Sequence, residues 1–110
     1  MITVYGVPGF GSAISEAMLT LADIPYQFHD VKGFDQPGPQ QEMLRKLNPL
    51  CQVPTLQLED GSVMTESAAV ALMILDSRPD LAPPEGTPER QQFWRLLIWL
   101  VANVYPTFTY

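Results

Sequence analysis

Strand-like and helix-like stretches alternate up to residue 75, and this order limits the fold more than any other feature of the sequence. Strand patterns cover residues 2–5 and 26–31, while helical patterns follow Ser12 and cover residues 40–47. Strands at 55–58 and 62–65 then flank an Asp-Gly hairpin signal, and a helix follows at 67–75. The order β-α-β-α-β-β-α predicts an α/β fold with helices on the faces of one sheet.

A proline-rich segment separates this unit, whose order is that of the thioredoxin fold, from a second one. Residues 78–88 predict a stiff linker. Thr87-Pro88-Glu89-Arg90 then starts a helix with a cap, a proline at the first position and an acid in the first turn. The helix is apolar nearly all round, so several elements should pack on it. We expect a domain at 1–77, a linker at 78–88 and, at 89–110, the first helix of a helical domain that continues beyond this chain.

Charge and cysteine content narrow the class of function. The chain has 110 residues, a net charge of −6 and a pI near 4.4, which argues against nucleic acid or anionic membrane as a partner. Cys51 is the single cysteine, so the chain has neither an intramolecular disulfide nor a CxxC motif. The N-terminus lacks a signal-peptide pattern, and the longest apolar stretch, residues 96–102, is too short to span a bilayer. We therefore expect a cytoplasmic protein that handles small molecules or other proteins.

The segment from Asn48 to Leu56 places a proline, Pro54, directly before a strand. Proline removes a hydrogen-bond donor from the ladder, so its presence needs a reason. If the Val53–Pro54 bond is cis, the N–H and C=O of Val53 point outward and are free to pair with a peptide-like ligand. An ordinary trans proline is the alternative and the commoner state, since only about 5–6% of X–Pro bonds are cis.

Glu66 and Ser67 stand where a strand leads into a helix. Ser67 is a natural N-cap, which by itself accounts for the residue. The free N–H groups and the helix dipole at such a point also form a carboxylate site, and Glu66 beside it could pair with an amine. Together the two residues would fit an α-amino acid head group.

The glycine-rich segment 6–11 leads from the first strand to Ser12. It lacks the spacing and the Lys-Ser/Thr of a phosphate-binding loop. Ser12 is a natural N-cap for the helix that follows. A hydroxyl and exposed amides at a helix N-terminus would also favour a thiolate over a thiol. Both roles are open for Ser12.

The string NPLCQVPTL at residues 48–56 resembles the Asn-Pro-x-Gly-x-Val-Pro-x-Leu signature of the glutathione S-transferase superfamily, and the Glu66-Ser67 pair follows at the family's usual distance. The linker LAPPEG at 81–86 and the ending YPTF at 105–108 also look like bacterial members. The resemblance covers the whole chain. It implies a thioredoxin-like, glutathione-binding domain followed by the start of an all-helical domain, because complete members are longer.

The resemblance implies binding roles at the tripeptide site. Val53, before a cis-Pro54, would bind the cysteinyl backbone of glutathione. Glu66 and Ser67 would hold the γ-glutamyl end. Gln52 stands where the family often places Lys or Gln near the tripeptide. Glutathione is thus the implied co-substrate.

In this family a Ser, Tyr or Cys in the first loop or helix start activates the thiol. Ser12 and, less well placed, Tyr5 are the candidates, because Gly11 stands where the bacterial pattern carries Cys. Lowering a thiol pKa of about 8.5 by about two units needs roughly 2.7 kcal/mol, which a hydroxyl and a helix dipole could supply together. We therefore expect Ser12-assisted thiolate chemistry rather than disulfide exchange. Lys32 is a candidate for binding the glycine carboxylate.

Other noticeable side chains have plainer interpretations. Cys51, where the family usually has Gly, is predicted to be a small buried thiol, with a mixed disulfide with glutathione as the alternative. His29 has no visible partner and is interpreted as structural. Tyr105 and Phe108 are interpreted as core or domain contacts, or as lining for an apolar co-substrate.

The resemblance thus implies a homodimeric glutathione transferase that acts on a small electrophile, and no metal is implied because the sequence has no His/Cys/Asp cluster. The alternative is a glutathione S-transferase-like module that has kept the fold and serves in protein association. The altered first loop, with Phe10 and Gly11, favours that alternative. A thioredoxin or glutaredoxin redox protein is disfavoured because the chain lacks CxxC.

Overall fold

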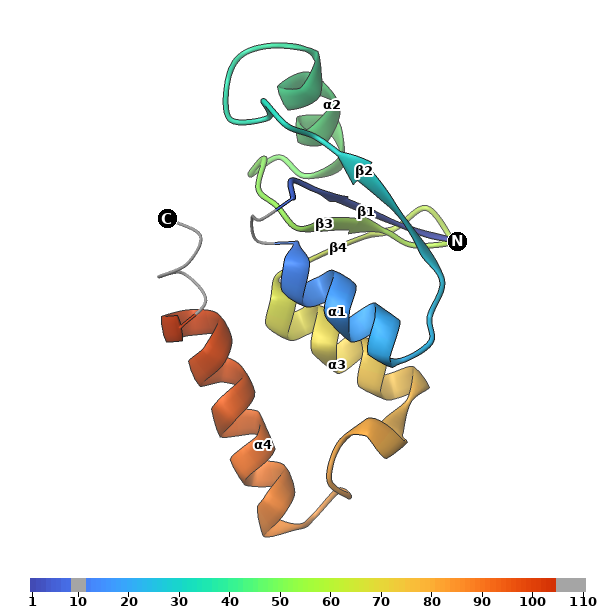
Figure 1. The fold of residues 1–110 in the computed structure, drawn as a ribbon, viewed down its shortest axis with the longest axis vertical. Helices are drawn as coiled ribbons and strands as arrows, with labels where there is room; N and C mark the ends of the chain where they lie inside the picture. Colours follow the sequence, from blue (N-terminus) through green and yellow to red (C-terminus); the bar gives the residue numbers. More distant parts are fainter. Residues whose placement is uncertain (9–11, 105–110) are drawn as a thin grey trace.

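In the computed structural model, which describes residues 1–8 and 12–104, a four-stranded sheet carries helices on its sides (Figure 1). The strands are β1 (Ile2–Gly6), β2 (Tyr26–Asp30), β3 (Thr55–Gln57) and β4 (Val63–Thr65), in the spatial order β2-β1-β3-β4. β1 runs parallel to β2, whereas β3 runs antiparallel to both β1 and β4. This arrangement confirms the α/β fold and the order of elements predicted from the sequence.

The helices are α1 (Ala13–Leu21), α2 (Pro39–Leu47), α3 (Ser67–Ser77) and α4 (Pro88–Trp99). α1 and α3 lie side by side against one face of the sheet, and α2 lies at the far end of the molecule (Figure 1). A short 3-10 helix, η1 (Pro79–Leu81), follows α3, and a π-helical turn, η2 (Leu100–Val104), extends α4.

The main core lies between the sheet and the pair α1 and α3. It forms because alternate residues of a strand point to the same face, so the buried positions of β1 and β3 meet the apolar stripes of both helices. Each buried Val, Leu or Ile side chain of this core contributes on the order of 1.5–3 kcal/mol relative to an exposed one. The cluster comprises Ile2, Val4, Leu19, Ala22, Leu56, Val70 and Ile74.

A second, smaller core lies between the end of β1 and α2. Its buried members are Val7, Val31 and Leu44. Cys51 and Val53 pack against it, so it fixes the loop that leads into β3. The candidate site described below is built on this loop.

β2 is more exposed than its alternating sequence predicted. Only Tyr26 is half-buried, and Phe28 is 37% exposed. The reason is topological: β2 is an edge strand that pairs only with β1, and burial at an edge depends on what covers it rather than on the pattern of the strand.

Of three helix caps predicted from the sequence, Thr87 is confirmed, Ser12 holds the predicted cap position without a capping bond, and Ser67 is wrong. The backbone N–H of Arg90 donates to Thr87 Oγ1 at 3.2 Å, as predicted for α4. Ser12 precedes α1 but has helical angles (φ −79°, ψ −15°) and makes no capping bond, because capping needs an extended backbone. Ser67 is already the first residue of α3, and Glu66 holds the cap position.

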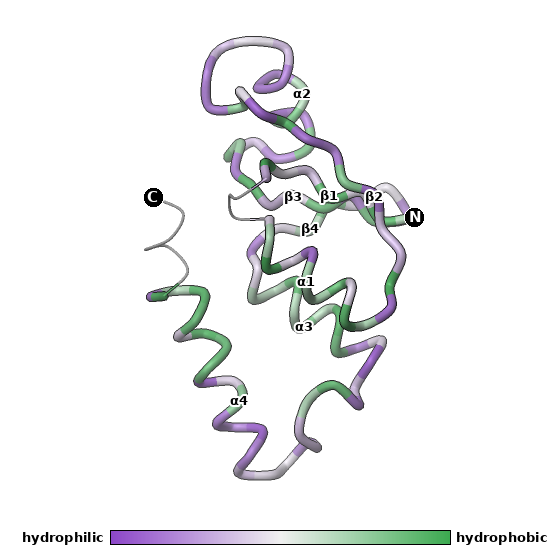
Figure 2. Tube along the Cα trace, in the orientation of Figure 1, coloured by the Kyte–Doolittle hydropathy of each residue, from purple (hydrophilic) through white to green (hydrophobic). Residues whose placement is uncertain are grey.

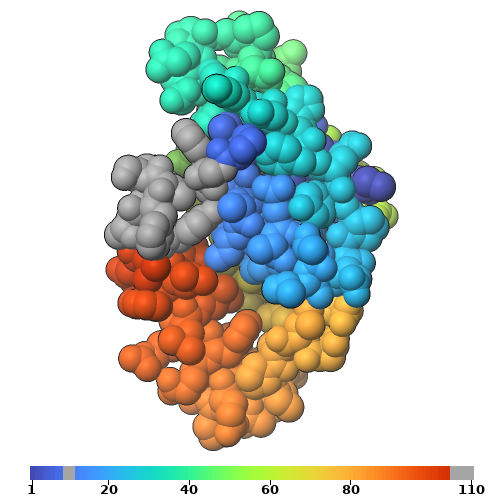
Figure 3. Space-filling view, in the orientation of Figure 1, coloured from blue at the N-terminus to red at the C-terminus, as the bar shows by residue number. Residues whose placement is uncertain are grey.

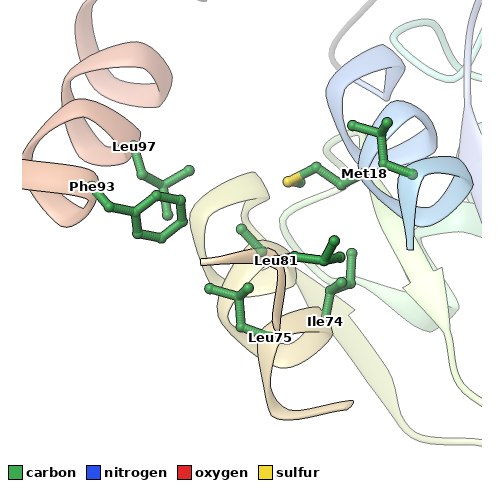
Figure 4. Close-up of a pocket in the computed structure, with 8 residues that line it drawn as sticks. Met18, Ile74, Leu75, Leu81, Phe93 and Leu97 are labelled. Carbon is green, nitrogen blue, oxygen red and sulfur yellow. The ribbon is translucent and has the colours of Figure 1, made fainter. Parts of the chain in front are cut away.

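α4 lies beside the rest of the molecule, and its later turns are mostly apolar (Figure 2). In the space-filling view its outer face is uncovered (Figure 3). Trp94, Leu96, Ile98 and Trp99 are each about half exposed. A cavity of about 290 Å³ separates α4 from α1 and α3, and Phe93 and Leu97 point into it toward Met18 (Figure 4). The several elements expected around this helix are not found among the described residues. None of the described helices combines the length and the apolarity that a membrane span requires.

Candidate functional site

The Val53–Pro54 peptide bond is cis. Pro54 is buried, Val53 is half-buried, and strand pairing begins only at Thr55. Within residues 1–8 and 12–104, neither the N–H nor the C=O of Val53 makes a hydrogen bond. An extended main chain with unused polar groups beside a sheet can add a peptide-like ligand as a further strand.

Asn48 fixes this loop, and it is a residue whose role the sequence did not reveal. Its side chain is buried; Oδ1 accepts from the N–H of Leu50 at 3.1 Å, and Nδ2 donates to Thr55 Oγ1 at 3.2 Å. The Thr55 hydroxyl in turn donates to the Gln52 carbonyl at 2.7 Å. These bonds close the loop on itself and hold Val53 in place. In the sequence, Asn48 and Thr55 are only two polar residues on either side of a proline-containing loop. That pattern does not predict that their side chains make contact.

The register of the sheet brings the two predicted binding segments together. Thr55 pairs with Thr65 in the antiparallel β3–β4 ladder. Val53 lies two residues before Thr55, and α3 begins at Ser67, two residues after Thr65. The unused backbone of Val53 and the N-terminus of α3, where free N–H groups attract a carboxylate, therefore belong to the same end of this ladder.

Glu66 occupies a strained position at the start of α3. Its φ of 69° and ψ of 116° lie outside the regions that side-chain-bearing residues normally adopt. Such a conformation costs of order 1–3 kcal/mol and occurs mainly at functional sites. Glu66 is exposed while Ser67 is buried, so the carboxylate faces solvent beside the helix N-terminus.

The two remaining predicted binding residues are exposed at the same end of the sheet. Lys32 follows β2, and its backbone N–H donates to Asp30 Oδ1 at 2.8 Å. The backbone N–H of Val31 donates to the Gly6 carbonyl at 2.9 Å, which continues the parallel pairing past the ends of β1 and β2. Gln52 precedes Val53 and is exposed. Both side chains are therefore accessible to a ligand along Val53.

Ser12 lies buried beneath the end of β1. It is 1% exposed, and its hydroxyl donates to Glu16 Oε2 at 3.4 Å. A Cβ on Gly6 would collide with the Ser12 side chain, so only glycine at position 6 leaves room for it. Tyr26 donates to the other carboxylate oxygen of Glu16, also at 3.4 Å. The hydroxyl that the sequence proposed for thiol activation is thus already engaged.

Tyr5, the second candidate for activating the thiol, points its hydroxyl toward Gln57. Its ring lies 5.1 Å from that of His29, and its hydroxyl is 3.5 Å from Gln57 Oε1. Because Tyr5 pairs with Thr55, Gln57 lies farther along β3, on the side away from Val53. The structure does not bring the Tyr5 hydroxyl to the cis-proline loop.

Cys51 adopts a left-handed backbone with φ 51°, a conformation that glycine tolerates best. The thiol is half-buried, with Sγ 3.7 Å from the Phe34 carbonyl oxygen and 3.8 Å from that of Gln41. The expected small thiol therefore packs against the second core.

The residues predicted to shape the first loop and the co-substrate pocket lie outside the described residues. They are Phe10, Gly11, Tyr105 and Phe108.

Residues 15–77, more than half of the chain, match the family model described as the N-terminal domain of glutathione S-transferases. The chain belongs to the glutathione S-transferase family. An uncharacterized GST-like protein of Escherichia coli K12, YncG, is 73% identical over 110 residues, which are 100% of this chain and 54% of that protein.

The chain is also similar to solved structures of bacterial glutathione S-transferases. A glutathione transferase of Methylococcus capsulatus is 29% identical with a TM-score of 0.82, over 98% of this chain and 54% of that one. A transferase homologue from Sulfitobacter, solved with bound glutathione, is 28% identical with a TM-score of 0.77, over 93% of this chain and 49% of that one. The chain therefore spans about half the length of the relatives that it matches.

Proposed function

We propose that the full-length protein binds glutathione at the cis-proline loop and transfers the glutathionyl group to a small electrophile: the thiol loses its proton, its sulfur bonds to the electrophilic atom, and the leaving group departs. The observation that carries this proposal is the unpaired backbone of Val53 at the end of the β3–β4 ladder where α3 also begins. Bound glutathione in the Sulfitobacter homologue supports the same ligand here.

Each part of the glutathione tripeptide would have its own partner in this arrangement. The cysteinyl N–H and C=O would pair with those of Val53 as an added antiparallel strand. The γ-glutamyl carboxylate would lie at the start of α3, near the Ser67 N–H, and the ammonium group beside Glu66. Gln52 and Lys32 would contact the glycine end, where Lys32 supplies the positive charge.

Ser12 is the proposed thiol activator, with Tyr5 less suitable because its hydroxyl lies toward Gln57. A serine hydroxyl has one hydrogen to donate. To stabilise a thiolate, Ser12 must turn that hydrogen from Glu16 toward the sulfur. The present contact is long at 3.4 Å, beyond the usual O–H···O range, so turning it costs little in hydrogen-bond energy.

The second candidate function is a glutathione-binding module without transferase activity. The observation that favours it is the burial of Ser12 and its engagement by Glu16. Such a module would keep the contacts of Val53, Glu66 and Ser67 and lack an activated thiol.

We also propose that residues 1–77 form the glutathione-binding domain, that 78–88 link it to a helical domain beginning at 89, and that the protein is a cytoplasmic homodimer. The end of α3 at Ser77 and the start of α4 at Pro88 support these boundaries. The exposed apolar side chains of Leu72 and Trp94 on α3 and α4 support association.

Calorimetry with glutathione on the full-length protein tests the site. Glu66→Gln should weaken binding about tenfold, since it removes a charged partner worth about 1.5 kcal/mol. Glu85→Gln is the matched control, because Glu85 is also exposed but lies in the linker. Equal losses in the two variants, or no binding by the unmodified protein, would contradict the site.

A conjugation assay with a nitroaromatic electrophile separates the two functions. Turnover that falls at least tenfold in Ser12→Ala, with binding retained, supports the transferase. Binding without turnover in the unmodified protein supports the module instead.

A further inference from the structure

The Gln52 carbonyl and the Val53 N–H belong to the same peptide unit, and a buried hydroxyl fixes how that unit is turned. Thr55 donates to the Gln52 carbonyl at 2.7 Å, within the usual O–H···O range. Thr55 is 0% exposed, so the carbonyl points toward the interior of the loop. The Gln52–Val53 bond is trans, and in a trans peptide unit the C=O and the N–H point in opposite directions. The Val53 N–H therefore points away from the loop interior.

Asn48 fixes the direction in which the Thr55 hydroxyl donates. A hydroxyl has one hydrogen to donate and lone pairs that accept. Asn48 Nδ2 donates to Thr55 Oγ1 at 3.2 Å, and Asn48 Oδ1 is itself held by the N–H of Leu50 at 3.1 Å. Because Asn48 occupies a lone pair of the hydroxyl, the hydrogen of Thr55 is directed to the Gln52 carbonyl. The protein's own side chains thus hold the peptide unit.

We propose that Thr55 is a positioning residue for glutathione: its hydroxyl, set by Asn48, turns the 52–53 peptide unit so that the Val53 N–H faces the cysteinyl carbonyl of the ligand. The inference rests on the glutathione site proposed above and concerns how tightly that site binds. Thr55 itself touches no part of the ligand, because its side chain is fully buried. It acts through the orientation of one N–H group.

A role in stability alone does not explain this pair of buried polar side chains. Valine has nearly the shape of threonine and suits a strand equally well. A buried hydroxyl must be hydrogen-bonded to offset its desolvation, and the net gain over an apolar group of the same shape is small. The specific consequence of the Thr55 hydroxyl is the direction of the Val53 N–H, which is unpaired within residues 1–8 and 12–104.

Removing the hydroxyl should weaken glutathione binding although no contact of the ligand is removed. In Thr55→Val the 52–53 peptide unit is free to turn, so the ligand must fix it on binding. Fixing the backbone of one residue costs a factor of about ten in affinity. The dissociation constant for glutathione should therefore rise about tenfold. Thr55→Ser keeps the hydroxyl and should stay within about twofold of the unmodified protein.

A second ligand shows whether the effect passes through the Val53 N–H. γ-Glutamylcysteamine keeps the γ-glutamyl group, the amide N–H and the thiol of glutathione, and it lacks the carbonyl that would accept from Val53. Thr55→Val should weaken its binding by less than about twofold, so that two ligands and two proteins form a thermodynamic cycle. Thr3→Val is the matched control, because the Thr3 hydroxyl accepts from Gln27 on the same sheet, away from the loop. It should leave both affinities unchanged.

Calorimetry on the full-length protein measures these affinities. If Thr55→Val does not fold, Asn48→Leu/Thr55→Val replaces it, because removing both partners costs less stability than leaving the Asn48 amide unpaired. The double variant should show the same loss of about tenfold. Hydrogen exchange of the Val53 amide, followed by NMR, needs no substitution. In the unmodified protein this amide should exchange freely, and glutathione should slow its exchange at least about tenfold.

The outcomes separate this inference from the proposed function. An unchanged affinity for glutathione without the hydroxyl, or an equal loss in Thr55→Ser, overturns the inference while glutathione binding itself stands. An equal loss for γ-glutamylcysteamine does the same, because the effect then bypasses the Val53 N–H. A Val53 amide that is already protected in the free protein, or that glutathione does not protect, also overturns the inference. Failure of the unmodified protein to bind glutathione overturns the inference and the proposed function together.

Discussion

Replacing Ser15 by alanine should stabilise the fold. Ser15 is 0% exposed, and within the described part of the chain its hydroxyl has no hydrogen-bond partner. It lies on the same face of α1 as the buried Leu19, one turn later. The hydroxyl is therefore desolvated without compensation inside an otherwise apolar face.

The expected gain follows from three contributions. A buried hydroxyl without a partner costs about 1–3 kcal/mol, and alanine has a better helix propensity than serine by about 0.5 kcal/mol. Against this, loss of one buried oxygen removes a few contacts of about 0.1–0.2 kcal/mol each. Ser15→Ala should thus raise the free energy of unfolding by about 1–2 kcal/mol, and Tm by about 6 °C per kcal/mol.

Urea unfolding followed by circular dichroism measures this gain, and an unchanged m-value would show that only stability has altered. Ser77→Ala is the control, because Ser77 is exposed at the end of α3 and reports helix propensity alone. It should change stability by less than about 0.5 kcal/mol. A Ser15→Ala variant less stable than the parent would refute the reasoning, because it would mean that the hydroxyl is satisfied in solution.

Other substitutions test the backbone and charge features described above. Gly6→Ala should destabilise by about 1–3 kcal/mol, because its Cβ would overlap Ser12, and adding Ser12→Gly should restore most of the loss in thermal unfolding. Cys51→Gly should be about 1 kcal/mol more stable than Cys51→Ala in chemical unfolding, since both lack the thiol but only alanine keeps the cost of φ 51°; equal stabilities would contradict this. The hydrogen bond from Arg78 lowers the pKa of Asp80 below its ordinary 3.8. That stabilisation is complete above pH 3.8 and is lost as the pH falls through the lower folded value, so Asp80→Asn should flatten Tm against pH in this range. A parallel fall of Tm in both proteins would show that the pair contributes nothing.

The sequence was sufficient for features that depend on neighbouring residues. The order of strands and helices and the cap at Thr87 follow from local patterns of hydrophobicity and turn residues. The same patterns failed where burial or backbone angle is set by distant elements. The exposure of β2 depends on its place at the sheet edge, and Ser12 could not cap because its backbone already has helical angles.

For the same reason, the sequence revealed only some of the residues that form the candidate site. Val53 is recognisable because a proline directly before a strand needs a reason, and Glu66 because an acid followed by serine at a helix start fits an α-amino acid head group. The contact between Asn48 and Thr55 joins residues seven positions apart around a cis bond. The contact between Glu16 and Tyr26 joins a helix to a strand. No local pattern encodes either contact, although together they position the loop and the hydroxyl on which the proposed chemistry depends.

The distribution of backbone strain supports placing function at the cis-proline loop. Three described residues other than glycine have positive φ: Asp23, Cys51 and Glu66. Asp23 is explained by helix termination, because the N–H of Ile24 bonds back to the Leu19 carbonyl at 3.0 Å in the manner of a left-handed helix end. Neither of the others ends a helix in this way. Cys51 lies two residues before Val53, and Glu66 directly follows β4 at the same end of the β3–β4 ladder. Relaxing either would stabilise the fold by about 1 kcal/mol or more, yet both are held by the packing around the loop. Both strained residues therefore border a backbone segment that is unpaired. A preformed peptide-binding edge requires such strain, and the packing of the core alone gives no reason for it.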